Sequence, residues 1–267
     1  MKSIEELKNT VICADCLDFM KDIPSNSIDM VLTSPPYDNL RTYKGYTFNF
    51  EGIAKEIYRV LKDGGVCVWI VGDMVINGSE SGTSFKQALF FKEIGFNIHD
   101  TMIYKKNGSP YPEKIRYYQN FEYMFIFSKG KPKTFNPIQD RKNKWLGSWG
   151  KRSVRTKSGE IIQANKIECK EYGTRFNIWE INNGAGFSTK DKIAYQHPAI
   201  FPEKLAEDHI LSWSNEGDTI LDPFAGSGTT LKMAKKNNRN YIGIEIAPEY
   251  IEIIKKRLQT NEPPIAQ

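Results

Sequence analysis

The sequence has no long apolar run and few residues of the types that bind metals or form disulfides. Its 267 residues include four Cys and three His. No apolar stretch approaches the roughly 20 residues that a membrane-spanning helix needs, and the first ten residues, MKSIEELKNT, contain no apolar signal core. These absences exclude the membrane-spanning class, and we expect a soluble protein of the cytoplasm.

Metal and redox chemistry also lack their usual residue patterns. Cys13 and Cys16 form a C-x-x-C pair, a spacing found in zinc and redox sites. No second pair of this kind and no His pair follows at zinc spacing, and Cys13 lies in an apolar, strand-like run. We therefore predict no bound metal, with the cysteines reduced as in a cytoplasmic compartment.

Strand-like and helix-like segments alternate in two blocks of the chain, a pattern typical of α/β layer architectures. Strands are predicted at residues 11–14, 28–33, 66–71, 98–105, 123–128, 219–222 and 241–245. Helices are predicted within 15–21 and at 50–61, 84–94, 202–213, 228–237 and 248–259, where apolar residues recur at helical spacing. Neither block, 1–128 or 197–260, has enough strands for a doubly wound domain, so we expect both to contribute to one sheet.

The composition changes between the two blocks. Residues 129–158 contain ten Lys or Arg and one acidic residue, Asp140, with Trp145 and Trp149 among Gly, Ser and Lys. A solvated loop is one interpretation of such a charge run. Basic residues interleaved with tryptophan favour a second interpretation, a surface that binds nucleic acid. The predicted DNA-binding residues in this run are Arg141, Lys142, Lys144, Lys151, Arg152 and Arg155. Lys105 and Lys106, in a second basic segment at 104–118, are also predicted to bind DNA.

A glycine-rich turn follows the predicted strand 219–222, in the sequence TILDPFAGSGTT. Gly226 and Gly228 allow the backbone to approach a ligand closely, and the amides at the start of the next helix favour a negative group such as a carboxylate. The following strand ends in Glu245, whose carboxylate suits the paired hydroxyls of a ribose. The spacing is neither G-x-G-x-x-G nor a Walker loop, which favours a nucleoside ligand without a pyrophosphate. The alternatives are a strand–helix turn without a ligand and, for Asp222, a helix cap.

A second motif, TSPPY at residues 33–37, ends the predicted strand 28–33. Its two prolines fix φ and remove two amide donors, which makes a rigid turn between the hydroxyl of Ser34 and the ring of Tyr37. A Pro-Pro turn that only closes a strand is the alternative. The carboxyl end of a strand, where open α/β sheets bind ligands, favours a functional site.

Together, TSPPY and LDPFAGSGTT resemble the motifs of the amino-methylating DNA methyltransferases, a [D/N/S]-P-P-[Y/F/W] catalytic motif and an F-x-G-x-G cofactor motif. The catalytic motif comes first, as in the circularly permuted β group of that family. The resemblance covers about 11–128 and 195–256. It implies a Rossmann-like class I methyltransferase fold, with a doubly wound, seven-stranded mixed sheet, circularly permuted. Its implied parts are a catalytic half (1–128), an inserted target-recognition region (129–195), a cofactor-binding half (196–260) and a flexible tail (261–267).

The resemblance also implies S-adenosyl-L-methionine as the cofactor and assigns the site residues. The implied catalytic residues are Ser34, Pro35, Pro36 and Tyr37. The implied cofactor-binding residues are Asp15 and Cys16 near the adenine, His197, Pro198 and Phe201 near the methionine part, Glu245 and Ile246 near the ribose, and Asp222, Pro223, Phe224, Ala225, Gly226, Ser227, Gly228, Thr229 and Thr230 in the glycine turn. For Asp15, a helix cap is the alternative.

Ser34 decides which base we expect to be methylated. Cytosine-N4 enzymes of the family usually carry Ser at this position, whereas adenine-N6 enzymes usually carry Asp or Asn. The sequence therefore predicts transfer of a methyl group to cytosine N4 in double-stranded DNA, after base flipping, by the modification enzyme of a restriction–modification system. A separately encoded endonuclease is an expected partner, and the chain is expected to be a monomer or homodimer. The alternatives are an adenine-N6 enzyme on the same fold, a methyltransferase of RNA or protein, and a non-catalytic nucleic-acid-binding protein.

Overall fold

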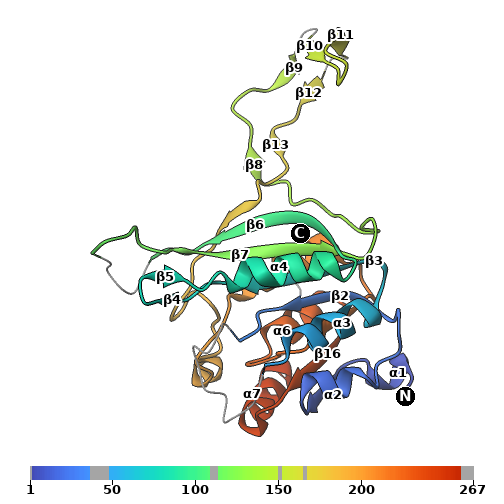
Figure 1. Cartoon of the computed structure of the whole chain (residues 1–267), viewed down its shortest axis with the longest axis vertical. Coiled ribbons are helices and arrows are strands. Elements are labelled where there is room, and N and C mark those ends of the chain that lie inside the picture. Colours follow the sequence, from blue (N-terminus) through green and yellow to red (C-terminus); the bar gives the residue numbers. More distant parts are fainter. Residues whose placement is uncertain (1, 37–47, 109–113, 150–151, 165–166, 260–267) are drawn as a thin grey trace. The chain divides into compact units, whose positions relative to one another are not determined.

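The structure, a computed structural model, describes residues 2–36, 48–108, 114–149, 152–164 and 167–259 (Figure 1). The chain divides into two compact units. The main unit consists of 1–136 and 177–267, and the insert unit of 137–176. Within the described residues, the helices are too short or too polar to cross a membrane. The tail predicted at 261–267 lies outside the described residues.

A mixed sheet of eight strands forms the centre of the main unit, in the order β1-β16-β15-β2-β3-β7-β6-β14 (Figure 1). β7 runs antiparallel to β3 and β6, and the other neighbouring pairs are parallel. The strand bounds are β1 Thr10–Cys13, β2 Ile28–Thr33, β3 Leu61–Val71, β6 Asn97–Lys105, β7 Phe121–Ser128, β14 Ile178–Glu180, β15 Thr219–Asp222 and β16 Asn240–Glu245. Because β1 pairs with β16 and β2 with β15, the two blocks of the chain share one sheet, as predicted.

All seven predicted strands are present, and the sheet gains an eighth, β14. The predicted count of seven was therefore too low. β14 has only three residues, and its central Trp179 is buried between two exposed neighbours. It pairs in parallel with β6, Trp179 opposite Tyr104. Three residues are too few for a recognisable alternation, so sequence pattern alone could not identify this strand.

Helices cover the sheet on both faces. Their bounds are α1 Ile4–Leu7, α2 Cys16–Met20, α3 Phe50–Val60, α4 Thr83–Glu93, the 3₁₀ helix η1 Lys192–Gln196, α5 Glu203–Trp213, α6 Thr229–Lys236 and α7 Pro248–Gln259. Trp69 of β3 and Phe91 of α4 belong to one apolar cluster, with ring centroids 5.1 Å apart. On the other face, His209 of α5 lies 3.1 Å from the sulfur of Met124 in β7. The alternation of side chains along each strand supplies apolar residues to both layers.

The junction between α3 and β3 differs from the prediction. The sequence predicted a helix over 50–61 and a strand over 66–71, with a connection between them, but β3 begins at Leu61, directly after the helix. The register with β2 shifts between the pairs Ile28–Leu61 and Met30–Val66. The extra residues of β3 are accommodated as a bulge, in which Gly64 has a φ of 81°.

The insert unit is built from three antiparallel strand pairs that are nested along the chain (Figure 1). The pairs are β8 Arg141–Lys142 with β13 Tyr172–Gly173, β9 Gly147–Trp149 with β12 Ile167–Cys169, and β10 Arg152–Arg155 with β11 Ile161–Ala164. The chain therefore runs out and returns as one two-stranded ribbon. The predicted recognition region, 129–195, is wider than this unit. Its ends belong to the main unit, where the amide of Asn136 donates to the carbonyl of Ser212 (2.8 Å) and β14 joins the sheet.

Candidate active site

The Pro-Pro turn and the glycine turn line one cavity of about 1540 Å³ in the main unit. Ser34, Pro35 and Pro36 contribute the end of β2, and residues 223–227 contribute the turn after β15. β2 and β15 are parallel neighbours, with Ile220 opposite Met30. Because the carboxyl ends of parallel strands meet at one edge of a sheet, two motifs almost 190 residues apart reach the same site.

A buried hydrogen bond joins the two strand ends. The hydroxyl of Thr33, the last residue of β2, donates to Oδ1 of Asp222, the last residue of β15, over 2.7 Å. The amide of Phe224 donates to the same oxygen over 3.1 Å. Burial raises the pKa of Asp222 to about 6, although its hydrogen bonds with Thr33, Thr230 and Phe224 act in the opposite direction. Asp222 therefore holds the turn in place.

Three predicted cofactor residues, Asp222, Gly228 and Thr230, are buried behind the cavity wall. Gly228 precedes α6 with a φ of 81°, and a Cβ there would lie 3.0 Å from Ile254. The hydroxyl of Thr230 donates to the carbonyl of Leu32 in β2. These contacts place the three residues as supports of the turn.

Gly226 and Glu245 form the floor of the glycine turn. The amide of Gly226 donates to Oε2 of Glu245 over 2.8 Å, and the amide of Ala247 donates to Oε1 over 2.9 Å. Burial raises the pKa of Glu245, and the two amides counteract part of that effect. Carboxylate oxygens have further lone pairs, and Glu245 and Ile246 both line the cavity. The carboxylate is thus fixed in place and can still accept bonds from hydroxyl groups.

Asp15 and Cys16 form another part of the wall, where α2 begins. Oδ1 of Asp15 accepts the amides of Leu17 (2.8 Å) and Asp18 (3.1 Å), so Asp15 caps the helix, the alternative that the sequence left open. Burial, together with the negative charge of Asp15, raises the pKa of the Cys16 thiol to about 12. Cys16 is therefore a neutral packing residue and not a nucleophile.

The described cysteines and acidic residues give no metal site. Cys13, Cys16, Cys67 and Cys169 are all free thiols. In the parts of the chain that the structure describes, no three His, Cys, Asp or Glu side chains are grouped so that they could hold a metal ion. The C-x-x-C pair is divided between an exposed Cys13 and a buried Cys16.

Residues 197–202 form the part of the cavity wall that contacts the glycine turn, and they include the predicted residues His197, Pro198 and Phe201. The ring of His197 packs on Gly226, where a Cβ would lie 3.2 Å from the ring. It also packs edge-on against Tyr250 of α7, with ring centroids 4.3 Å apart. A glycine at position 226, with a φ of 53°, is thus required both by the backbone and by the ring above it.

The fold, the shared cavity and the two motifs agree with what comparison with known proteins finds. Residues 28–256 match the family described as DNA methylase, of the N6/N4 type. The chain belongs to this family. This DNA methylase is similar to the orphan methyltransferase M.BamHII of Bacillus amyloliquefaciens, with 62% identity over 90% of this chain and 91% of the relative.

Solved structures match the DNA methylase along almost its whole length. The PvuII DNA methyltransferase, described as cytosine-N4-specific, has a TM-score of 0.67 at 21% identity, over 96% of this chain and 88% of its own. A DNA modification methylase of Thermus thermophilus, solved in complex with S-adenosyl-L-methionine, has a TM-score of 0.61 at 25% identity, over 93% of each chain. The predicted α/β methyltransferase fold with its large mixed sheet is confirmed.

A third wall of the cavity was not predicted as a unit. It includes Tyr104 of β6, Glu122 of β7 and Asn183, together with Lys106, which the sequence assigned to DNA contact. The hydroxyl of Tyr104 is buried and has no hydrogen-bond partner among the described residues. No local motif marks these residues, because the pairing of β6 with β7 and β14 is what brings them together. Phe48 and Phe50, at the start of α3, also line the cavity.

Several predicted DNA-binding residues of this DNA methylase have partners within the chain. Lys105 pairs with Glu180 (3.0 Å), and Lys106 pairs with Glu122 (3.1 Å). Arg141 stacks over the ring of Phe176, 4.6 Å from its centroid, and its Nε donates to the carbonyl of Thr174. These three residues stabilise local structure, whatever else they bind.

The other predicted DNA-binding residues belong to the insert unit. Lys142, Lys144 and Arg155 are exposed there, and Arg152 lies in β10. Tyr37, among the predicted catalytic residues, and Lys151 lie outside the described residues. Residues 137–176 contain ten Lys or Arg and four Asp or Glu. The insert unit thus carries six excess positive charges, whereas the whole chain carries five, so the rest of the chain is nearly neutral.

Proposed function

We propose that this DNA methylase transfers a methyl group from S-adenosylmethionine to N4 of cytosine in double-stranded DNA. The observation that supports this most strongly is the shared cavity, which Ser34-Pro35-Pro36 and the glycine turn both line. A methyl donor held by the glycine turn and an amine held by the Pro-Pro turn would be side by side, as direct transfer requires.

The residues of the cavity fit a nucleoside cofactor. Gly226 leaves the space that a Cβ would fill beneath the ring of His197, and Glu245 presents a fixed carboxylate suited to ribose hydroxyls. Asp15 reaches the cavity with its carboxylate, of which Oδ1 is occupied by the helix cap. Bound S-adenosylmethionine supplies an electrophilic methyl group.

Ser34 and Pro35 act on the acceptor. An exocyclic amine is a poor nucleophile, because its lone pair is delocalised into the ring. The hydroxyl oxygen of Ser34 and the carbonyl oxygen of Pro35 would accept hydrogen bonds from the two N–H groups of the amine. This would direct the lone pair of the amine toward the methyl group. S-adenosylmethionine held by the glycine turn and Glu245 would supply the methyl group and leave as the neutral thioether, and the amine would lose one proton to solvent. Tyr37 is proposed to stack on the flipped base, which is worth about 1–3 kcal/mol.

The excess positive charge of the insert unit supports DNA as the polyanionic partner. Its basic side chains accompany exposed apolar ones such as Trp145, 70% exposed, a combination suited to phosphates and bases. We propose that the insert unit is the target-recognition region. That a separate restriction endonuclease accompanies the enzyme stays a prediction, as does the expected monomer or homodimer.

Adenine N6 is the second candidate acceptor, because the matching family is of the N6/N4 type. Ser34 favours cytosine, since the sequence resemblance associates a serine at this position with methyl transfer to N4. The deciding experiment uses purified protein, duplex DNA and S-adenosylmethionine, followed by digestion to nucleosides and chromatography with mass spectrometry. Chromatography is needed because N4- and C5-methylated deoxycytidine have the same mass. N6-methyladenine as the sole product would refute the cytosine assignment, and unmethylated DNA would refute transfer to DNA.

A further inference from the structure

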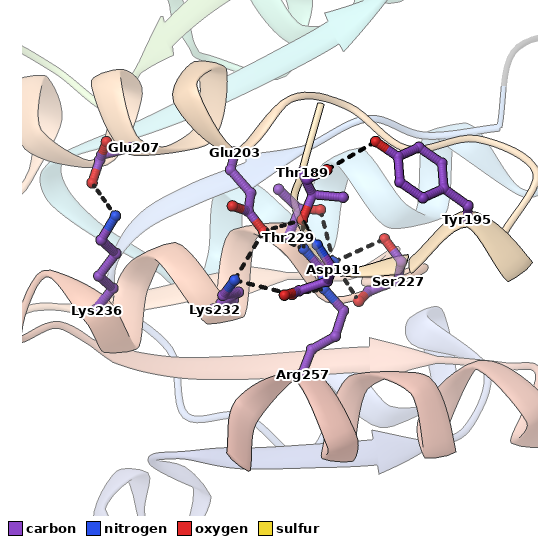
Figure 2. Close-up of polar contacts among 10 residues, drawn as sticks. All are labelled: Thr189, Asp191, Tyr195, Glu203, Glu207, Ser227, Thr229, Lys232, Lys236 and Arg257. Atoms are coloured by element: carbon purple, nitrogen blue, oxygen red, sulfur yellow. Dashed lines mark hydrogen bonds and ion pairs between the residues drawn. The ribbon is translucent and has the colours of Figure 1, made fainter. Parts of the chain in front are cut away.

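A cluster of four charged side chains adjoins the glycine turn, with its two cations buried and its two carboxylates partly buried (Figure 2). It contains two cations, Lys232 of α6 and Arg257 of α7, and two carboxylates, Asp191 and Glu203. The side chain of Arg257 is 0% exposed and that of Lys232 is 5% exposed. Buried charges are tolerated when they are paired and hydrogen-bonded, and equal numbers of each sign meet that condition. Burial by itself would raise the pKa of Asp191, but the hydrogen bonds from Lys232 and Arg257 outweigh this effect, and the pKa is lowered.

One side of the Arg257 guanidinium contacts the glycine turn. Its Nη1 lies 2.8 Å from the carbonyl oxygen of Ser227, 3.1 Å from the Ser227 hydroxyl and 3.1 Å from the Thr229 hydroxyl. Ser227 and Thr229 both line the cavity. The guanidinium therefore binds the turn from behind, through backbone and side chains together.

The other side contacts the two segments that flank residues 197–202 in the chain. Nε lies 3.0 Å from Oδ2 of Asp191, which precedes residues 197–202, and Nη2 lies 2.6 Å from Oε1 of Glu203, which follows them. Lys232 pairs with the same two oxygens, at 3.0 and 3.2 Å. Figure 2 shows Asp191 and Glu203 directed toward Arg257 and Lys232.

We propose that Arg257 is a positioning residue for S-adenosylmethionine, which holds the glycine turn and the wall 197–202 at the spacing that the cofactor requires. The inference rests on the proposed function of the cavity. The same helix, α7, supports the wall at a second point, because Tyr250 packs against His197. Helix α7 thus contacts His197 in the wall and Asp191 and Glu203 on either side of it, and Arg257 connects these residues to the glycine turn.

The shape of the guanidinium explains why arginine is needed at this position. Its planar fork presents five N–H donors in fixed directions, whereas a lysine ammonium presents three donors at one point. The acceptors around Arg257 lie on two different segments of chain. Lysine would supply the charge, but one ammonium cannot bond to both segments in the same way.

The experiment compares Arg257→Lys and Arg257→Met with the wild type in the full-length protein. Lys236→Met is the matched control, because Lys236 pairs with Glu207 between α6 and α5 (3.4 Å), one helical turn from the cluster's Lys232 and Glu203. Calorimetry gives Kd for S-adenosylmethionine, steady-state kinetics give kcat and KM, and thermal unfolding gives the stability of each protein. For both Arg257 variants we expect Kd and KM for S-adenosylmethionine to rise about tenfold or more, about 1.4 kcal/mol per factor of ten, with kcat at saturating cofactor within about twofold. Lys236→Met should lose stability while Kd stays at the wild-type value.

Wild-type cofactor affinity in folded Arg257→Met would overturn the proposal, as would an equal loss of affinity in Lys236→Met. If the Arg257 variants do not fold, Asp191→Asn serves in their place, since it keeps the side-chain shape and removes one carboxylate from the wall. Wild-type affinity in that variant overturns the proposal too. Gly226→Ala separates the role proposed for Arg257 from the proposed role of the cavity as the cofactor site. If that variant binds S-adenosylmethionine normally, the cavity is not the cofactor site. If it alone loses affinity, the cavity stands and only the role of Arg257 is refuted.

Discussion

The hydroxyl of Thr33 and the carboxylate of Asp222, 189 positions apart in the chain, share a buried hydrogen bond of 2.7 Å. Thr33 directly precedes the Pro-Pro turn, and Asp222 directly precedes the glycine turn. The bond therefore sets the distance between the residues proposed to hold the acceptor amine and those proposed to hold the methyl donor. Both residues are almost fully buried, which keeps water from competing for the bond.

Thr33→Val should remove this bond while keeping the β-branched shape. The Asp222 carboxylate would lose one of its donors, so we expect the free energy of unfolding to fall by about 1–3 kcal/mol and turnover to fall about tenfold because the turns lose their alignment. Urea unfolding and single-turnover methylation measure the two effects. Thr10→Val is the control, because Thr10 bonds to the carbonyl of Leu7. Equal turnover in both variants would show that the Thr33 bond is only structural.

Asp222→Asn should change how stability depends on pH. The pKa of Asp222 is raised to about 6 in the folded protein, whereas in the unfolded chain it is about 4. Between these values the folded state binds more protons than the unfolded state, so this group lowers the stability as the pH rises from about 4 to 6. Relative to the wild type, the Asn variant should gain on the order of 2–3 kcal/mol across that window. Urea unfolding at closely spaced pH values checks this, and a parallel pair of curves would contradict the buried, raised pKa.

Gly226→Ala should weaken cofactor binding beyond its effect on stability. The backbone has a φ of 53°, and the new Cβ would lie 3.2 Å from the His197 ring. Gly217→Ala is a matched control, since Gly217 has a φ of 83° with open space around it. Both variants should lose about 1–2 kcal/mol of stability from the left-handed backbone, but only Gly226→Ala should raise Kd for S-adenosylmethionine in calorimetry. A similar Kd in both would separate the glycine turn from cofactor binding.

Ser34→Ala should affect chemistry more than cofactor binding. Removing one of the acceptors that orient the amine is expected to lower the single-turnover rate about 10²-fold, while Kd for S-adenosylmethionine stays near the wild-type value. Pre-steady-state methylation and calorimetry provide the two numbers. If the rate and the cofactor affinity fall together, Ser34 shapes the cavity and does not act on the amine.

Charge removal in the insert unit should weaken DNA binding and reduce its salt dependence. Lys144 and Arg155 are exposed, and each lost phosphate contact should reduce the slope of log K against log salt by about 0.9. The double variant Lys144→Gln, Arg155→Gln is compared with Lys255→Gln, an exposed lysine of α7 in the main unit. Fluorescence anisotropy with duplex DNA at several salt concentrations gives the slopes. An unchanged slope in the insert variant would locate the phosphate contacts elsewhere.

The sequence by itself determined seven strands of the sheet, six helices and the two motifs, because these depend on local signals. The runs of apolar residues predicted seven strands, all of which the structure contains, and helical spacing predicted six helices. Prolines and glycines marked the turns at 34–36 and 223–228. Most of the residues that the sequence resemblance assigned to the cofactor, from Asp15 to Glu245, line the cavity. The three-residue β14 and the bounds of the insert unit carried no comparable signal.

Only the tertiary structure decided which distant residues meet. The pairing of β2 with β15 brings the Thr33 hydroxyl within hydrogen-bond distance of Asp222. The packing of α7 brings Arg257 into contact with Asp191, Glu203 and Ser227. Arg257 continues the buried stripe of Ile253 and Ile254, so a charged residue at an inward position was the one hint in the sequence. Its partners could not be inferred, because the energy of a buried charge depends on the groups that surround it in space, and helical periodicity shows only which side of the helix faces inward.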